Sequence, residues 1–390
     1  MAAERLVIAG EVYSTNLGDG VIHETLAYLF RSQDPSLQIK GLDISGRPGW
    51  GETPLQSGWK TKTIKIGKVR LGAVYSLANA LRLLALIRTR HSNQWKTLLE
   101  NSATMVIGGG QLLMDNHLDF PVKLYELRRI ANQYHIPIHI TACGVKAGWS
   151  PAATILLRKV LLEARSITVR DPASQHSLGS LVPEISCTLT FDPAIYAADV
   201  YGSGNGEGQT LIGLGVISLL DVNLHRPRPS LISETDWMNT WLGIIQALEA
   251  TQLRCQIFTN GSPADEEFAR KLQTKAQNIS SGLLPLAQRP ILPRQLAHQI
   301  SRYSGIIAAR LHASLIAASY HIPAVGLSWE TKVASFFNEI GRPENLFPLD
   351  GFDPQDLAER LSISIQQGVT SMAIENCRAK ALRNVTAVMR

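Results

Sequence analysis

The segment GIIAARLHASLIAASYHIPAVGLSWETK, residues 305–332, contains two short apolar runs separated by a helical pattern. GIIAA and IPAVGLSW predict buried strands, and HASLIAASY predicts a helix between them. Leu311, Leu315 and Ala318 recur on one side of that helix and predict its buried stripe. A helix that connects two such strands is typical of a parallel sheet, so this segment predicts an α/β fold.

The rest of the chain repeats this alternation in two series. The first consists of the runs LVIAG (6–10), ATMVIGGG (103–110), IPIHITACG (136–144), SITVRD (166–171) and LTFDP (189–193). The second consists of TLIGLGVIS, RCQIFTNG, SGIIAAR and IPAVGLSW, and it begins after the glycine-rich segment VYGSGNGEGQ. We therefore expect two Rossmann-like domains that face a cleft. The expected boundaries are 1–199 for the N-terminal domain, 200–209 for the linker, 210–352 for the C-terminal domain and 353–390 for a helical segment.

Length and composition agree with two globular domains. The chain has 390 residues, of which 45% are hydrophobic and 18% charged. The N-terminal sequence MAAERLVIAGEVYS predicts a first strand rather than a signal peptide, and no apolar window is long enough to predict a membrane span. The four cysteines follow no metal-ligand spacing, so we expect reduced thiols in a cytosolic protein and no metal site.

The positive charge is concentrated in one insert of the N-terminal domain, residues 60–99. This insert has nine basic residues and no acidic one, whereas the rest of the chain has 29 basic and 32 acidic residues. One interpretation is a solvated basic face; the other is attraction to an anionic membrane surface or a charged glycan precursor. Within the insert, LANALRLLALIRTR predicts an amphipathic helix that lies on a bilayer or packs on the core. Nucleic acid is not an expected partner, because no recognition motif accompanies the charge.

Ligands of open α/β sheets bind at the carboxyl ends of the strands, so polar residues directly after each apolar run are candidate site residues. A glycine-rich turn lets a ligand approach the backbone, and amide groups at a helix start favour anions. The triplet Gly108–Gly110 is equally well explained by tight packing, because it matches neither GxGxxG nor a Walker loop. In the N-terminal domain, the candidate site residues selected by this rule are Asn16, Gly18, Asp19, Gly109, Gly110 and Gln111.

Arginine and histidine follow other strands. Arg170 is at the end of a buried strand and needs an anion or a carboxylate partner there, whereas Asp171 after it predicts a helix N-cap. Arg310 and His312 fall outside the buried stripe, in the first turn of their helix, where the helix dipole also favours anions. Lys332 follows the next strand and reaches the same edge of the sheet. The convergence of these groups predicts a small, highly anionic substrate.

Four motifs in this order resemble the polysaccharide pyruvyl transferase family: NLGD (16–19), VIGGGQLLMD (106–115), ITVRDPAS (167–174) and ARLHASLIAASYHIPAVGLSWETKVASFF (309–337). The resemblance implies a fold like that of the GT-B glycosyltransferases. It also implies that the chain transfers pyruvate from phosphoenolpyruvate to two hydroxyls of a sugar as a ketal, without a cofactor or a metal. The acceptor would be a polysaccharide or glycan precursor, either lipid-linked at the inner face of the membrane or soluble.

The resemblance further implies roles for individual residues. Arg170, Arg310, Leu311 and Lys332 would bind the phosphate and carboxylate of the donor. His312 and Arg310 would be the catalytic residues, with His312 as the acid/base group. The glycines and polar residues of the N-terminal candidates would lie on the acceptor side or in the cleft. Two alternatives stay open at this point. One is a GT-B glycosyltransferase that uses a nucleotide sugar, for which Glu330 is the nearby acidic residue that could bind a ribose. The other is a non-catalytic protein of the same fold that binds a glycan or a membrane.

Overall fold

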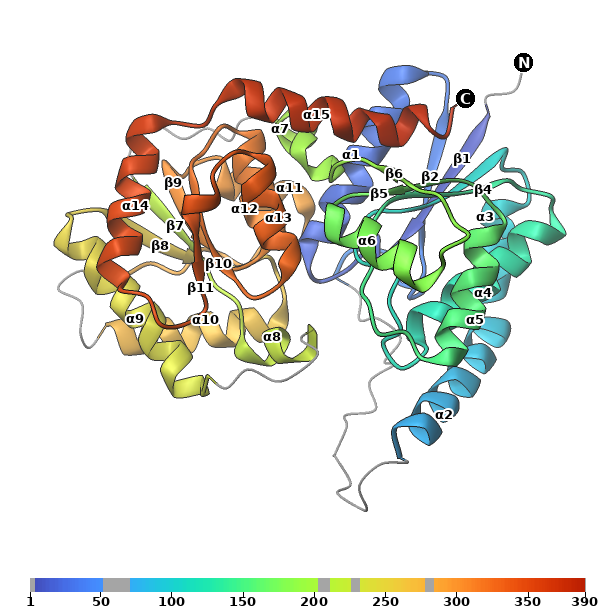
Figure 1. The fold of residues 1–390 in the computed structure, drawn as a ribbon, viewed down its shortest axis with the longest axis horizontal. Coiled ribbons are helices and arrows are strands. Elements are labelled where there is room, and N and C mark those ends of the chain that lie inside the picture. The colour runs from blue at the N-terminus through green and yellow to red at the C-terminus, as the bar shows by residue number, and fades with distance from the viewer. Residues whose placement is uncertain (1–3, 52–70, 203–210, 226–231, 278–283, 390) are drawn as a thin grey trace. The chain divides into compact units, whose positions relative to one another are not determined.

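The computed structural model describes residues 4–51, 71–202, 211–225, 232–277 and 284–389 (Figure 1). Contacts divide the chain into two compact units. Unit 1 consists of Met1–Ser14, Ile22–Pro193 and Lys380–Arg390, and unit 2 of Thr15–Val21 and Ala194–Ala379. These units differ from the boundaries expected from sequence, because residues 15–21 and 194–199 group with unit 2 and the last eleven residues with unit 1. Most of the expected linker, residues 203–209, lies outside the described residues.

Unit 1 contains a six-stranded parallel sheet in the order β2-β1-β3-β4-β5-β6. Its inner strands are buried along nearly their whole length, which explains their continuous apolar sequences. The strands are β1 (Arg5–Gly10), β2 (Gln38–Asp43), β3 (Thr104–Gly108), β4 (Ile138–Cys143), β5 (Ala164–Val169) and β6 (Thr188–Leu189). The helices are α1 (Leu17–Gln33), α2 (Leu71–Leu86), the π-helical turn η1 (Ile87–His91), α3 (Ser92–Leu99), α4 (Asp119–Gln133), α5 (Pro151–Leu162) and α6 (Pro172–Leu181).

Unit 2 contains a five-stranded parallel sheet in the order β11-β10-β9-β7-β8. Its strands are β7 (Leu211–Gly215), β8 (Arg254–Phe258), β9 (Gly305–Ala308), β10 (Ala324–Ser328) and β11 (Leu346–Pro348). From residue 193 onward, the helical segments are η2 (Pro193–Tyr196), α7 (Ala197–Tyr201), α8 (Leu219–His225), α9 (Glu234–Ala250), α10 (Pro263–Ala276), α11 (Pro293–Ile300), α12 (Leu311–Ser319), α13 (Thr331–Glu339), η3 (Pro343–Asn345), α14 (Pro354–Gln367) and α15 (Ser371–Thr386), and the last part of α15 groups with unit 1.

The α/β fold predicted from residues 305–332 is confirmed, since β9, α12 and β10 form the expected strand, helix and strand. Leu311, Leu315 and Ala318 of the predicted stripe are buried, but so is every other residue of α12, so this helix has no exposed side. Besides β9 and β10, this short helix contacts α7, α11 and α13, so it has neighbours on all sides. His312, which was expected outside the stripe, is therefore only 7% exposed.

The described part of the basic insert forms α2, η1 and α3, whereas residues 60–70 lie outside the described residues. The expected amphipathic helix packs on the core of unit 1 through Leu83 and Ile87. None of the helices in the described ranges is both long and apolar enough to cross a bilayer. The four cysteines are free thiols, and three of them are buried.

Candidate active site

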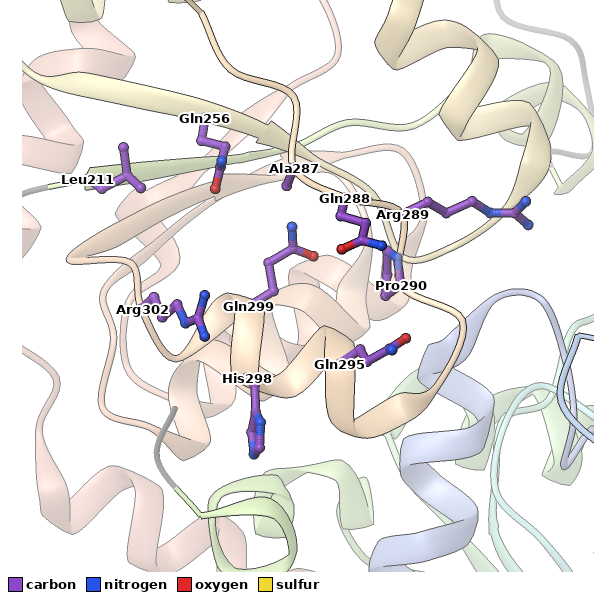
Figure 2. A pocket seen from close by; sticks show the side chains of 10 residues that line it. All are labelled: Leu211, Gln256, Ala287, Gln288, Arg289, Pro290, Gln295, His298, Gln299 and Arg302. Carbon is purple, nitrogen blue, oxygen red and sulfur yellow. The ribbon is translucent and has the colours of Figure 1, made fainter. Parts of the chain in front are cut away.

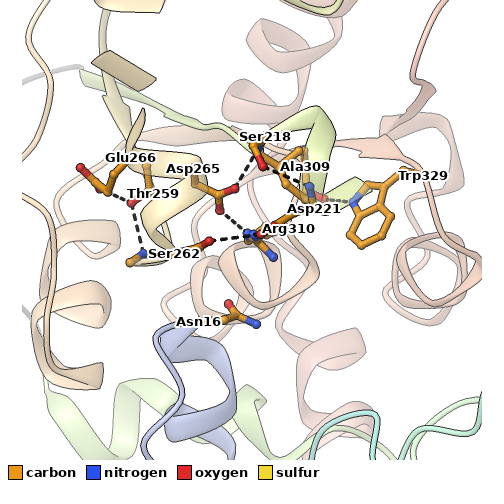
Figure 3. Close-up of polar contacts among 12 residues, drawn as sticks. Asn16, Ser218, Asp221, Thr259, Ser262, Asp265, Glu266, Ala309, Arg310 and Trp329 are labelled. Carbon is orange, nitrogen blue, oxygen red and sulfur yellow. Dashed lines mark hydrogen bonds and ion pairs between the residues drawn. The ribbon is translucent and has the colours of Figure 1, made fainter. Parts of the chain in front are cut away.

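Arg310 lies at the carboxyl end of the unit 2 sheet, directly after β9, and is the N-cap residue of α12. Its side chain is buried and bound by two carboxylates (Figure 3). Nε donates to Asp265 at 2.5 Å, and Nη2 donates to Asp221. Burial lowers the pKa of Arg310, but the two carboxylates outweigh it and raise the pKa above its usual value. Arg310 is thus a fixed guanidinium ion.

The two carboxylates differ in their surroundings. The side chain of Asp265 is fully buried in the first turn of α10 and accepts a 2.9 Å hydrogen bond from the backbone N–H of Ser218. Burial raises the pKa of Asp265, although Arg310 opposes this shift. The side chain of Asp221, in α8, is 19% exposed and accepts a second hydrogen bond, from the Ser262 hydroxyl at 3.1 Å. Two carboxylates face one guanidinium, so the trio carries a net negative charge when both are ionised.

The sequence predicted an anionic substrate at this sheet edge, but in the structure the charge of Arg310 already has two carboxylate partners. A buried guanidinium requires charged partners, and the chain supplies them from α8 and α10. Sequence reasoning missed Asp221 and Asp265. Both lie shortly after the carboxyl ends of β7 and β8, so the rule that selected Arg310 could also have selected them.

His312 lies in the first turn of α12, where Gly18 packs against its side chain. A Cβ atom at position 18 would lie 2.6 Å from His312 Cβ and closer still to the ring atoms Cγ and Nδ1. Gly18 is part of α1 and has no positive φ, so space rather than backbone conformation requires a glycine there. The backbone N–H of Leu17 donates to the carbonyl of Asn260 at 2.9 Å, which anchors the same turn in unit 2.

The NLGD residues were expected in the N-terminal domain, on the acceptor side. The structure instead groups Asn16, Gly18 and Asp19 with unit 2, which also contains His312 and Arg310. Asn16 Nδ2 lies 3.4 Å from the Asp19 carboxylate. Figure 3 shows Asn16 at the start of α1, below Arg310 in this view. Chain order alone assigned these residues to the wrong unit.

Lys332 follows β10 at the expected edge of the sheet, but it too has a carboxylate partner. Its ammonium group forms an ion pair with Glu330 and lies 5.4 Å from the centre of the Trp329 ring. Trp329 Nε1 donates to the carbonyl of Ala309 at 2.6 Å, which links the ends of β10 and β9. Leu311, the residue after Arg310, is buried. The predicted cations of unit 2 therefore both belong to internal ion pairs.

In unit 1, the glycine triplet follows β3. Gly109 and Gly110 both have a φ of +72°, which side-chain-bearing residues rarely adopt. The Gly110 carbonyl accepts a 2.8 Å hydrogen bond from Gly144, at the end of β4. A Cβ atom at position 109 would also collide with Ile22 of α1. The positive φ accounts for both glycines, tight packing against Ile22 is a second reason for Gly109, and half-buried Gln111 follows them.

Arg170 follows β5 and is buried against the backbone of Gly144. Its Nη1 donates to Asp192 at 2.7 Å, and its Nε lies 3.7 Å from the carboxylate of Asp171. Asp192, shortly after β6, is thus the main partner of this arginine. The predicted cap is present, because Asp171 accepts from the backbone N–H of Ser174 at 2.7 Å. That Arg170 and Arg310 bind one anion together stays a prediction.

Unit 2 also has a cavity of about 510 Å³ between β8 and α11 (Figure 2). Arg289 lines it and donates to the carbonyl of Gly261 at 2.7 Å. The cavity contains none of the site residues predicted from sequence. In the described ranges, no three His, Cys, Asp or Glu side chains are grouped to hold a metal ion. The lining residues are Leu211, Gln256, Ala287, Gln288, Arg289, Pro290, Gln295, His298, Gln299 and Arg302.

Solved structures define the class of fold. The chain is similar to UDP-GlcNAc 2-epimerase from Methanocaldococcus jannaschii, with 10% identity, a TM-score of 0.60 and 99% of each chain covered. It is also similar to S. aureus MnaA solved with UDP, with 12% identity, a TM-score of 0.53 and coverage of 97% of this chain and 91% of that one. A trehalose-phosphate synthase from Burkholderia vietnamiensis has 13% identity, a TM-score of 0.52 and coverage of 100% and 96%. The fold is therefore of the GT-B type.

The family follows from the sequence. The family model described as polysaccharide pyruvyl transferase matches residues 16–331, so the chain belongs to that family. A search of curated proteins finds no match. The matched range begins at Asn16 and includes Arg170, Arg310 and His312, whereas Lys332 lies one residue beyond its end.

Proposed function

We propose that this protein transfers a pyruvyl group from phosphoenolpyruvate to two hydroxyls of a sugar in a polysaccharide or glycan precursor. The products are a pyruvate ketal and inorganic phosphate. The observation that carries the proposal is the family match over residues 16–331, which includes His312 and Arg310 at the carboxyl end of the unit 2 sheet. In the proposed reaction His312 is the acid, and Arg310, Leu311, Arg170 and Lys332 bind the donor.

The reaction balances with one histidine as the proton carrier. His312 donates a proton to the methylene carbon of phosphoenolpyruvate, and the oxygen of the first sugar hydroxyl bonds to C2. The proton of that hydroxyl returns to the imidazole. The bond between C2 and the phosphate oxygen then breaks, the second hydroxyl oxygen bonds to C2, and its proton leaves with the phosphate. General acid catalysis of this kind typically contributes about 10²- to 10⁴-fold in rate.

The ion pairs of Arg310 set a condition on donor binding. A phosphate or carboxylate that binds this guanidinium competes with carboxylates already present. Asp265 is fully buried, whereas Asp221 is partly exposed on a short helix, so Asp221 is the partner that the donor replaces or shares. Once Asp221 has been displaced, the Arg310 guanidinium, still held by Asp265, can stabilise charge that develops on the phosphate.

A nucleotide-sugar transferase is the alternative that the fold itself suggests, since S. aureus MnaA was solved with UDP. Glu330 was the acidic residue of the sequence that could bind a ribose. In the structure its carboxylate is paired with Lys332, so binding a ribose would require breaking that pair. Because Lys332 would have to leave the same pair to bind phosphoenolpyruvate, this contact does not distinguish the two donors, and the family match is what favours phosphoenolpyruvate.

The test is transfer of radiolabelled phosphoenolpyruvate to a panel of lipid-linked and soluble oligosaccharides, with phosphate release measured in parallel. We expect one phosphate released for each pyruvyl group transferred, and a loss of at least about 100-fold in kcat for His312→Ala. His176→Ala, at an exposed position of α6, is the matched control and keeps normal activity. Near-normal turnover of His312→Ala would exclude His312 as the acid, and label transfer from a nucleotide sugar instead would exclude the proposed donor.

A further inference from the structure

Helix α2 is apolar on the side that packs on unit 1 and also on the opposite side. Its sixteen residues, LGAVYSLANALRLLAL, include one charged residue, Arg82, and no acidic one. Leu83 belongs to the unit 1 core and is 5% exposed. Leu77 and Leu81, one turn apart, are 59% and 60% exposed. A helix on the surface of a globular protein normally has polar residues on its outer side, so the exposed leucines require another explanation.

The exposed side of α2 continues into basic residues. Leu77, Leu81, Ala85 and Arg88 follow at intervals of four, four and three residues, and all are exposed. We call these four residues the α2 face. Arg90, two residues further on, is exposed as well. Figure 1 shows α2 at the edge of unit 1, with its N-terminal half extending past α4 and α5.

The charge of the described residues indicates what binds the α2 face. Residues 71–99, which form α2, η1 and α3, contain the four basic residues Arg82, Arg88, Arg90 and Lys96 and no acidic one. A second copy of this chain on the same face would bring two such basic segments together, and their charges would repel. An anionic lipid surface complements both features, because leucine side chains enter the acyl boundary while arginine side chains remain among the headgroups.

We propose that the α2 face docks on the surface of an anionic lipid bilayer. The leucines supply apolar area, and Arg88 and Arg90 supply attraction to the headgroups. Arg88 also pairs with buried Glu126 at 3.1 Å, which holds the C-terminal end of this face against unit 1. The docking does not depend on pyruvyl transfer, so it can be tested whether or not that reaction is the function.

The experiment is co-sedimentation of the full chain with phosphatidylcholine vesicles that contain or lack phosphatidylglycerol. We expect binding only with phosphatidylglycerol, and weaker binding at high salt. The double variant Leu77→Ser, Leu81→Ser loses the apolar contacts and binds at least about tenfold more weakly. Arg90→Gln binds about fivefold more weakly, since one basic residue near the headgroups is lost.

The matched control is Ile155→Ser, Leu162→Ser on α5, where the side chains are 59% and 48% exposed. This variant should bind vesicles like the parent protein, and circular dichroism checks that both double variants are folded. Equal binding of parent and Leu77→Ser, Leu81→Ser variant would overturn the proposal. The proposal would also be overturned if the parent protein self-associated without binding vesicles and the Leu77→Ser, Leu81→Ser variant were monomeric. The α2 face would then be an interface between copies of this chain.

Discussion

Gly18→Ala is the substitution that most directly tests whether the NLGD turn positions His312. The added Cβ would lie 2.6 Å from His312 Cβ and closer to the ring, so the imidazole or the turn must move. A normal carbon–carbon contact is about 3.5–4.0 Å, which requires a shift of about 1 Å. A misplacement of about 1 Å can cost about 100-fold in rate. We therefore expect kcat to fall by about 100-fold.

The effect on stability should be much smaller. Overpacking typically costs about 1–3 kcal/mol, whereas replacing a helical glycine by alanine gains about 1 kcal/mol. The free energy of unfolding of Gly18→Ala should therefore fall by no more than about 2 kcal/mol, measured by urea denaturation. Gly179 is the matched control, because it is exposed in α6 and a Cβ there would contact nothing within 4 Å. Gly179→Ala should keep the parent kcat.

A second background separates positioning of His312 from a general defect. His312→Ala would keep the Cβ that lies 2.6 Å from the new atom, so His312→Gly is the variant that removes every clashing atom. In that background Gly18→Ala should cost no stability. An unchanged kcat in Gly18→Ala, or the same loss of stability with glycine at position 312, would refute the positioning role.

Three further outcomes follow from the ion pairs and buried groups. Asp221→Asn removes the carboxylate that competes for Arg310 and should lower the KM for phosphoenolpyruvate by about tenfold, equivalent to about 1.4 kcal/mol. The control is Asp199→Asn, which removes a 2.6 Å ion pair with Arg378. A raised KM in Asp221→Asn would contradict the proposal that Asp221 competes with the donor. Asp265→Asn leaves one ion pair of Arg310 broken in the interior and should lower the free energy of unfolding by about 3 kcal/mol in urea denaturation. Burial lowers the pKa of His139 from 6.5 to about 4. As the pH falls, His139 is therefore protonated in the unfolded chain before it is protonated in the folded protein. The contribution of neutral His139 to the free energy of unfolding should be complete above pH 6.5 and should be lost, by up to about 3 kcal/mol, as the pH falls to 4. His139→Gln removes this share of the pH dependence, and an unchanged slope would contradict the assignment.

The strands with continuous apolar sequences could be predicted from the sequence, since β1, β3, β4, β9 and β10 all lie within predicted runs or one residue from them. The edge strands β2 and β11 were missed. QIKGLD of β2 alternates between exposed and half-buried positions before its buried end, and LFP of β11 has only three residues. Periodicity gives little signal for such strands.

The place of the candidate residues Arg310 and His312 in the fold could also be predicted, but their side-chain partners could not. Arg310 and His312 lie at a strand end, as expected. The carboxylates that bind Arg310 are 45 and 89 residues away in the sequence, and only the folded sheet brings them to it. The all-round burial of α12 likewise depends on α7, α11 and α13, which no pattern within residues 305–332 can indicate.

The central claim is that phosphoenolpyruvate is the donor, and calorimetric titration of the full chain tests it without a known acceptor. The titration compares phosphoenolpyruvate with UDP-GlcNAc, the ligand class that the alternative function requires. We expect phosphoenolpyruvate to bind and UDP-GlcNAc to give no heat of binding. Saturable binding of UDP-GlcNAc, with none of phosphoenolpyruvate, would contradict the proposed function.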